Sequence, residues 1–106
     1  MITLCIRYTL NPTKLADFET YARALPSQIE RCGGKLRGYY LPTKFAGPTN
    51  AALALIDFPS LAAYEQYRAK LVADPEAVES VRRVDQSGCV LNEDRSILQR
   101  VAESAN

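Results

Sequence analysis

The chain has 106 residues, of which 47% are hydrophobic and 24% are charged, and its formal net charge at pH 7 is +1. These values are typical of one globular domain with one core. They exclude the basic surface that nucleic-acid binding requires, and no apolar run approaches the roughly 20 residues that span a bilayer. An alternating pattern begins directly after Met1, without a basic region or a cleavage site, so we expect a cytoplasmic protein without a signal peptide.

The chain contains no histidine. Histidine is the usual general base near neutral pH, and it completes most catalytic triads and many metal sites. We therefore predict no metal site, and any catalysis would depend on carboxylates, tyrosine, lysine, arginine, cysteine or a bound cofactor. The sequence itself indicates no cofactor. Cys5, Cys32 and Cys89 are far apart and lack CxxC spacing, which predicts buried thiols rather than a disulfide framework or a zinc site.

Residues 2–9 alternate between apolar and mixed side chains, which predicts a strand with one apolar face. Asn11-Pro12 then starts a helix, with Asn11 as its cap. Apolar residues recur at steps of three and four from Leu15 to Cys32 and give this helix a buried stripe. Pro26 lies inside the pattern and predicts a kink or local break, and Gly33-Gly34 ends the helix.

The middle of the chain predicts two further strands. Residues 35–41 form the first of them, and Pro42 closes it. Residues 42–50 contain proline and glycine and predict a loop longer than a tight turn. Residues 51–58 are almost wholly apolar until Asp57, which predicts a central strand covered on both faces.

The remaining elements are helical segments followed by a strand. Ser60 is the expected cap of the next helix, and Asp74-Pro75 starts another helical segment in the same way. Residues 87–98 predict the last strand, with a bend or bulge at residues 92–94.

The order strand, helix, strand, strand, helix, strand predicts an α+β domain of the ferredoxin-like βαββαβ type. In this split βαβ arrangement a four-stranded antiparallel sheet carries the helices on one face. We expect a single domain over residues 1–100 and a flexible tail over residues 101–106. The other face of the sheet is left bare with mixed side chains, which favours a partner, and a second copy in a homodimer is the simplest one.

Two stretches, RCGGKLRGYYLP at residues 31–42 and FPSLAAYEQYRAKLVADPE at residues 58–76, resemble bacterial NIPSNAP domain proteins. The resemblance extends over residues 1–98 and implies a dimeric α/β barrel, in which two ferredoxin-like protomers close their sheets face to face. It implies no particular reaction, because the family has no agreed activity, and relatives with the same barrel include cofactor-free monooxygenases, isomerases, haem-degrading enzymes and chlorite dismutases. The haem-handling relatives hold iron through histidine, so its absence from this chain disfavours haem.

The mixed sheet face is the first candidate site. Strict alternation places Lys35, Arg37, Tyr39 and Leu41 on one side of their strand. If this side shares the barrel lumen with Arg7, two guanidinium groups and a phenol converge on a small anionic or oxygen-rich ligand. Alternatively, Arg7 and Arg37 form ion pairs or line a dimer interface without a ligand.

Asp57 is the second candidate, because it follows the apolar run AALALI. Three interpretations are open: a general base with a raised pKa, an ion-pair partner for Arg7, or a residue that helps the chain turn into the helix at Ser60.

Tyr64, Tyr67 and Arg68 form the third candidate cluster. Tyr64 and Arg68 are four residues apart and share a helix face. They either reach a ligand in a cavity, or the aromatic rings pack on the sheet with their hydroxyl groups at the rim.

Two functions fit these features. The first is a small dimeric protein that binds a small organic or anionic ligand in its barrel. The second is a cofactor-independent enzyme, monooxygenase- or isomerase-like, that acts on a small oxygenated metabolite. In that case Arg7, Arg37, Tyr39 or Asp57 would stabilise an enolate-like anion. Neither a nucleic acid nor a membrane is predicted as a partner.

Overall fold

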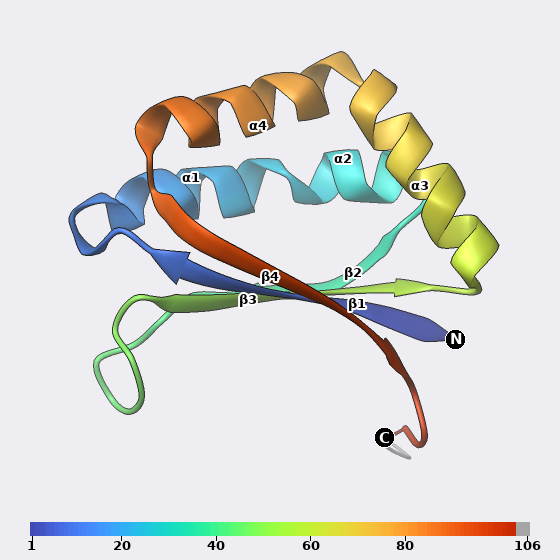
Figure 1. The fold of residues 1–106 in the computed structure, drawn as a ribbon, viewed down its shortest axis with the longest axis horizontal. Coiled ribbons are helices and arrows are strands. Elements are labelled where there is room, and N and C mark those ends of the chain that lie inside the picture. Colours follow the sequence, from blue (N-terminus) through green and yellow to red (C-terminus); the bar gives the residue numbers. More distant parts are fainter. Residues whose placement is uncertain (104–106) are drawn as a thin grey trace.

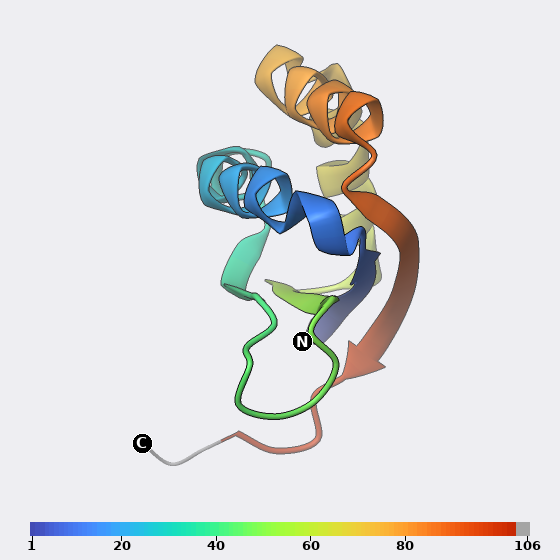
Figure 2. The ribbon, with the colours of Figure 1, turned by 90° about the vertical axis from the view of Figure 1, so that its left-hand side faces the viewer.

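The computed structural model describes residues 1–103 of the chain. Its elements are, in chain order, β1 (Ile2–Leu10), a short 3-10 helix (Pro12–Lys14), α1 (Leu15–Ala24), α2 (Pro26–Arg31), β2 (Lys35–Tyr40), β3 (Ala51–Phe58), α3 (Leu61–Ala73), α4 (Pro75–Ser87) and β4 (Val90–Gln99). All helices lie on one face of a twisted antiparallel sheet (Figures 1 and 2). The predicted ferredoxin-like α+β fold is thereby confirmed.

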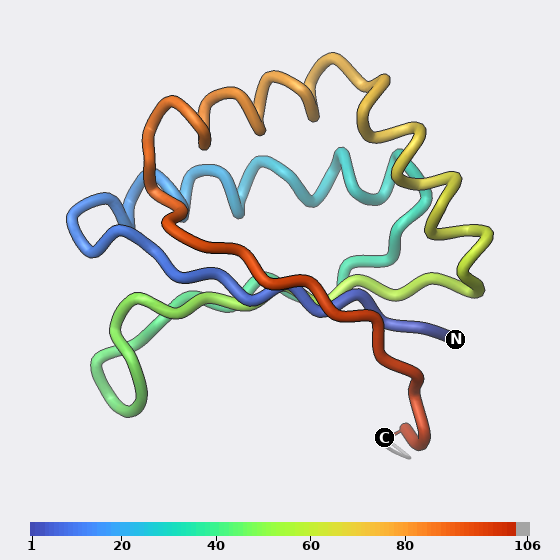
Figure 3. Tube along the Cα trace, viewed as in Figure 1, coloured from blue at the N-terminus to red at the C-terminus, as the bar shows by residue number. Residues whose placement is uncertain are grey.

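The sheet has the strand order β2-β3-β1-β4. The first and last strands of the chain, β1 and β4, therefore lie side by side (Figure 3). The predicted central position of β3 is confirmed, because it pairs with both β1 and β2. Its open face is not covered by residues 1–103, since Leu53 and Leu55 are only partly buried there.

The starts of the helices and the end of α2 follow the local sequence. The side chains of Asn11 and Ser60 accept hydrogen bonds from the backbone N–H groups of Thr13 and Ala63, at 3.0 and 3.1 Å. Pro26 lacks the N–H that a continuous helix needs, so the predicted long helix divides into α1 and α2. Gly33 follows α2 with a φ of 105°, a conformation that glycine adopts without a Cβ clash.

A bulge in β2 changes the predicted orientation of its side chains. Leu36 pairs with Ile56 and Gly38 with Leu55, so Arg37 is an extra residue between two consecutive pairs. The predicted alternation, which placed Tyr39 on the same side as Arg37, is therefore wrong. Tyr39 lies on the face that the helices cover, and the following residue, Tyr40, lies on the open face.

The predicted start of the last strand at Ser87 is also wrong. Ser87 is the last residue of α4, which extends for 13 residues. Gly88, with a φ of 70°, ends the helix, so the strand begins at Val90. The irregularity in β4 falls at Leu91 rather than at residues 92–94, because Thr9 pairs with Asn92 and Leu10 with Val90.

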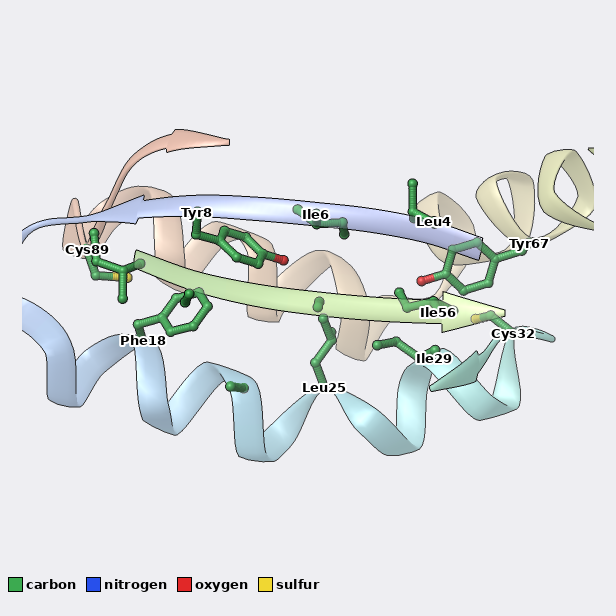
Figure 4. Close-up of a cluster of buried hydrophobic side chains, with 14 of the residues drawn as sticks. Leu4, Ile6, Tyr8, Phe18, Leu25, Ile29, Cys32, Ile56, Tyr67 and Cys89 are labelled. Carbon is green, nitrogen blue, oxygen red and sulfur yellow. The ribbon is translucent and has the colours of Figure 1, made fainter. Parts of the chain in front are cut away.

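The core lies between the sheet and the helices. Leu4, Ile6 and Ile56 from the sheet pack against Leu25, which lies between α1 and α2, and against Ile29 of α2 (Figure 4). The predicted burial of all three cysteines, Cys5, Cys32 and Cys89, is confirmed.

Two further features concern the length of the helices and the C-terminal residues. None of the helices in residues 1–103 is long and apolar enough to cross a membrane. Residues 101–103 form neither helix nor strand, and the rest of the predicted tail, residues 104–106, lies outside the described residues.

Candidate functional site

The side chain of Asp57 lies on the open face of the sheet and joins three partners. It accepts hydrogen bonds from the Thr3 hydroxyl at 2.7 Å, from Arg37 at 2.5 Å and from Arg100 at 2.7 Å. Burial alone would raise its pKa, but hydrogen bonds from Thr3 and both arginines outweigh burial and lower the pKa to about 2. This geometry disfavours a general base, and Ser60 rather than Asp57 caps α3. The Asp57 carboxylate thus links β3 to β1, to β2 and to Arg100, the residue after β4.

Arg7 and Arg37 do not converge. Both lie on the open face, but Arg37 is engaged with Asp57, which pairs with Thr3 in the sheet. Thr3 is four residues from Arg7 along β1, which corresponds to roughly 13 Å. Arg7 is exposed and lies opposite Asp94 of β4. The ion-pair alternative therefore applies to Arg37, and a common anion site for both arginines has no geometric support.

Tyr39 belongs to an aromatic cluster on the helix-covered face. Its ring centroid lies 6.4 Å from those of Tyr8, Phe18 and Tyr21. Tyr8 comes from β1, Tyr21 from α1 and Tyr39 from β2, so three elements bring three phenols together. This convergence depends on the bulge at Arg37, which turns Tyr39 toward the helices.

The three residues of the predicted cluster on α3, Tyr64, Tyr67 and Arg68, lie in different environments. Tyr67 is the buried member, at 3% exposure, and its ring centroid lies 4.8 Å from that of Phe58. Tyr64 packs edge-on against the same phenylalanine at 5.3 Å. The rings thus pack on the sheet, while Tyr67 and the exposed Arg68 also line a cavity.

This cavity, which we call the central cavity, lies between the sheet and α1, α3 and α4. Its volume is about 330 Å³, at the lower end of the range of pockets that hold small organic ligands. Most of its wall is apolar, and the polar groups are four phenols and two guanidinium groups. They belong to Tyr8, Tyr21, Tyr39, Tyr67, Arg68 and Arg95. Tyr8 and Tyr67 direct their hydroxyl groups toward the middle of the sheet from opposite ends (Figure 4).

The phenols on the cavity wall are neutral hydrogen-bond donors at physiological pH. Burial, which disfavours the phenolate, is the largest cause of the raised pKa values of Tyr8, Tyr21 and Tyr39. The same cause raises the pKa of Tyr67 to about 12. The hydroxyl groups of Tyr8, Tyr21 and Tyr39 also hydrogen-bond one another through Tyr39. A neutral phenol has one proton to donate, so Tyr67 and the end of this chain of hydroxyls are the donors left for an acceptor oxygen in the cavity.

Arg95 supplies a positive charge at the β4 side of the cavity. It pairs with Ile6 of β1 in the sheet, so its side chain starts from the helix-covered face. Its guanidinium group contacts the Glu93 carboxylate at 2.8 Å, and both side chains are more than one-third exposed. Burial would lower the pKa of Arg95, but Glu93 outweighs this and raises it. The guanidinium stays charged and accessible to a ligand.

Three residues of the central cavity were missed by the sequence reasoning. The alternation of residues 2–9 predicts that Tyr8 lies on the apolar face of its strand, and this is correct, but the pattern indicates no ligand role for it. Tyr21 and Arg95 were given no role. The alternation of β4 could have indicated Arg95 only if the register between β4 and β1 had been known, because the strand itself has no continuous apolar face.

Comparisons with known proteins agree with the fold. The NIPSNAP family model matches residues 3–105. A NIPSNAP-like domain protein from Burkholderia xenovorans is 27% identical, with a TM-score of 0.79, over 99% of this chain and 89% of the other. A NIPSNAP family protein of unknown function from Agrobacterium tumefaciens is 21% identical, with a TM-score of 0.82, over 99% and 92%.

A more distant match carries a functional name. A putative antibiotic biosynthesis monooxygenase from Nitrosomonas europaea is 11% identical, with a TM-score of 0.72, over 96% of this chain and 100% of the other. At this identity the likeness shows the shared fold of the dimeric α/β barrel proteins and does not carry the activity over. No curated protein matches the chain.

Proposed function

Because the chain belongs to the NIPSNAP family, which specifies no reaction, we propose a function from the chain's own central cavity: it binds a small organic molecule that has an apolar body and an acceptor oxygen. The observation that carries this proposal is the combination of an apolar wall with four neutral phenols and the Arg95 guanidinium. The polar groups are hydrogen-bond donors at neutral pH, so they favour a carboxylate or carbonyl oxygen. Donors of this kind favour binding over proton abstraction.

The binding test uses 4-phenylbutyrate, which has a ring, a short chain and one carboxylate. Isothermal titration calorimetry on the wild-type protein is expected to show saturable binding. Arg95→Met should weaken it about tenfold, because a charge-assisted hydrogen bond is lost. Tyr67→Phe should weaken it about threefold, as expected for one neutral hydrogen bond from a hydroxyl on the cavity wall.

The matched control is Arg82→Met. Arg82 is exposed on α4 and pairs with Glu79 of the same helix, away from the central cavity. This variant should bind within twofold of wild type. Absence of wild-type binding, or equal losses in Arg95→Met and Arg82→Met, would overturn the proposal.

The open face of the sheet supports a second part of the proposal, a homodimer. Leu53 and Leu55 from β3 are partly buried there, and Tyr40 and Leu98 are each 49% exposed. No helix covers this face within residues 1–103 (Figure 1). A second copy would remove these apolar side chains from water, and the homodimer would agree with the fold that the chain shares with dimeric α/β barrel proteins.

Equilibrium sedimentation tests the dimer. Wild-type protein at micromolar concentration is expected to sediment as a dimer, and Leu55→Lys as a folded monomer. Leu61→Lys is the control, because Leu61 is 57% exposed on α3, on the helix side of the sheet. A wild-type monomer, or dissociation by both variants alike, would contradict dimerisation through the open face.

A further inference from the structure

Helix α4 is anchored by side-chain hydrogen bonds at both of its ends. At the start, the Asp74 carboxylate accepts hydrogen bonds from two backbone N–H groups of α4 and from Arg31 at 2.7 Å. At the end, the Ser87 hydroxyl donates to Asp17 of α1 at 2.6 Å. Between these contacts the helix buries only Ala77.

The middle of α4 borders the central cavity. Val78 and Val81 are 49% and 44% exposed, although they belong to the apolar side of the helix. Both line the central cavity. Apolar side chains that face a cavity rather than packed atoms lose contacts that a ligand could restore.

A second cavity, which we call the β4 cavity, lies between α4 and β4. Its volume is about 430 Å³. It shares four wall residues with the central cavity, namely Tyr8, Tyr21, Val81 and Arg95. The two cavities therefore adjoin beneath α4, and the phenols of Tyr8 and Tyr21 and the guanidinium of Arg95 lie at the junction.

The walls of the two cavities differ in chemistry. The central cavity is lined mainly by aliphatic side chains, among them Leu4, Ile6 and Leu71, and carries no carboxylate among the described residues. The β4 cavity carries two carboxylates, those of Asp85 and Glu93. Glu93 pairs with Arg95, whereas Asp85 has no ion-pair partner within residues 1–103. The central cavity thus favours an apolar group, and the β4 cavity favours a hydrogen-bond donor.

From this arrangement we infer that the ligand is an amphiphile that occupies both cavities. Its apolar body fills the central cavity, its carbonyl oxygen accepts hydrogen bonds at the junction, and a hydroxylated or cationic head extends into the β4 cavity toward Asp85. This inference rests on the proposed binding of an organic molecule in the central cavity and adds the second compartment and the chemistry of the head.

Three probes with the same phenylbutanoyl body test the inference by calorimetry. They are 4-phenylbutanamide, N-(2-aminoethyl)-4-phenylbutanamide and N-(4-phenylbutanoyl)glycine, which differ only in having no head, a cationic head or an anionic head. The aminoethyl probe is expected to bind about tenfold more tightly than the unextended amide, because its ammonium group meets Asp85. The glycine conjugate should bind more weakly than the aminoethyl probe, because Asp85 and Glu93 repel its carboxylate.

Two pairs of variants assign the effect to the β4 cavity. Val84 lines the β4 cavity but not the central one, and Val78 lines only the central cavity. Val84→Phe should abolish the gain of the aminoethyl probe and leave the unextended amide within twofold, whereas Val78→Phe should weaken all probes alike. Asp85→Asn should reduce the gain without altering the packing, and Asp94→Asn, on the open face, should not.

The outcomes separate the inference from the proposal on which it rests. If no probe binds, the proposed function fails. If the unextended amide binds, but the head makes no difference or Asp85→Asn leaves the gain intact, then only the second compartment is overturned. Selective loss of the gain in Val84→Phe and Asp85→Asn supports the inference.

Discussion

Arg100 Nη2 lies 2.7 Å from Asp57 Oδ2 and ties the end of β4 to the end of β3. The Asp57 side chain is 1% exposed, whereas that of Arg100 is 21% exposed, so the pair lies at the boundary between core and solvent. A buried carboxylate is stable only with partners, and Arg37 and Thr3 complete the set. This cluster therefore joins four separate segments on the open face, namely β1, β2, β3 and the residue after β4.

The lowered pKa of Asp57 predicts a loss of stability in acid. A carboxyl group whose pKa is about 2 in the folded state stabilises the fold above the unfolded pKa of about 4, and this contribution is lost as the pH falls from about 4 to about 2. Asp57→Asn should unfold about 2 kcal/mol more easily at pH 7 and should show a smaller decline over that pH range. Urea unfolding at several pH values measures both, and parallel pH profiles would contradict the assignment.

The bulge at Arg37 predicts unequal losses of stability at two neighbouring tyrosines. Tyr39→Ala removes a ring that packs against Tyr8, Phe18 and Tyr21, and should destabilise the fold by about 3 kcal/mol. Tyr40→Ala removes a ring that is 49% exposed, and should change the free energy of unfolding by less than about 1 kcal/mol. Chemical denaturation of the two variants at a concentration where the wild type is monomeric compares them. A larger loss in Tyr40→Ala than in Tyr39→Ala would show that strict alternation, not the bulge, orients the strand.

Gly34 is predicted to tolerate no side chain. A Cβ atom at this position would lie 2.9 Å from a methyl carbon of Ile56 and 3.0 Å from one of Ile29, both in the core. Gly34→Ala should therefore lower stability by roughly 1–3 kcal/mol through overpacking. Thermal unfolding followed by circular dichroism tests this, and the control is Ser27→Ala on the exposed side of α2. An unchanged midpoint in Gly34→Ala would mean that this part of the core can relax.

The buried phenols predict alkaline unfolding. Burial raises the pKa of Tyr67 to about 12 and also raises the pKa values of Tyr8, Tyr21 and Tyr39. The folded state is fully stabilised by these neutral groups below the unfolded pKa of about 10, and it loses that stability as the pH rises further.

Absorbance of phenolate and far-ultraviolet circular dichroism measure this transition together. Ionisation of the buried phenols should coincide with loss of helix, and Tyr67→Phe should move the midpoint to higher pH. Ionisation well before unfolding would indicate that these hydroxyl groups are hydrated.

Much of the fold could be predicted from local chemistry. Asn11 and Ser60 cap their helices through their own side chains, and Pro26 breaks a helix because it lacks an N–H group. The site could not be predicted in the same way. Tyr39 was assigned to the wrong face because a bulge depends on the pairing of two strands, which the order of residues in one strand does not reveal.

The sequence alone determined the fold class of this protein, since apolar periodicity, caps and breakers act over a few residues and specify each element and its buried side. The tertiary structure decided the geometry of the central cavity, on which the proposed function rests. Tyr8, Tyr21, Tyr39 and Arg95 come from four elements and meet only when the sheet register and the helix packing are set. Burial then changes their chemistry, because the pKa of a phenol depends on the atoms around it rather than on its neighbours in the chain.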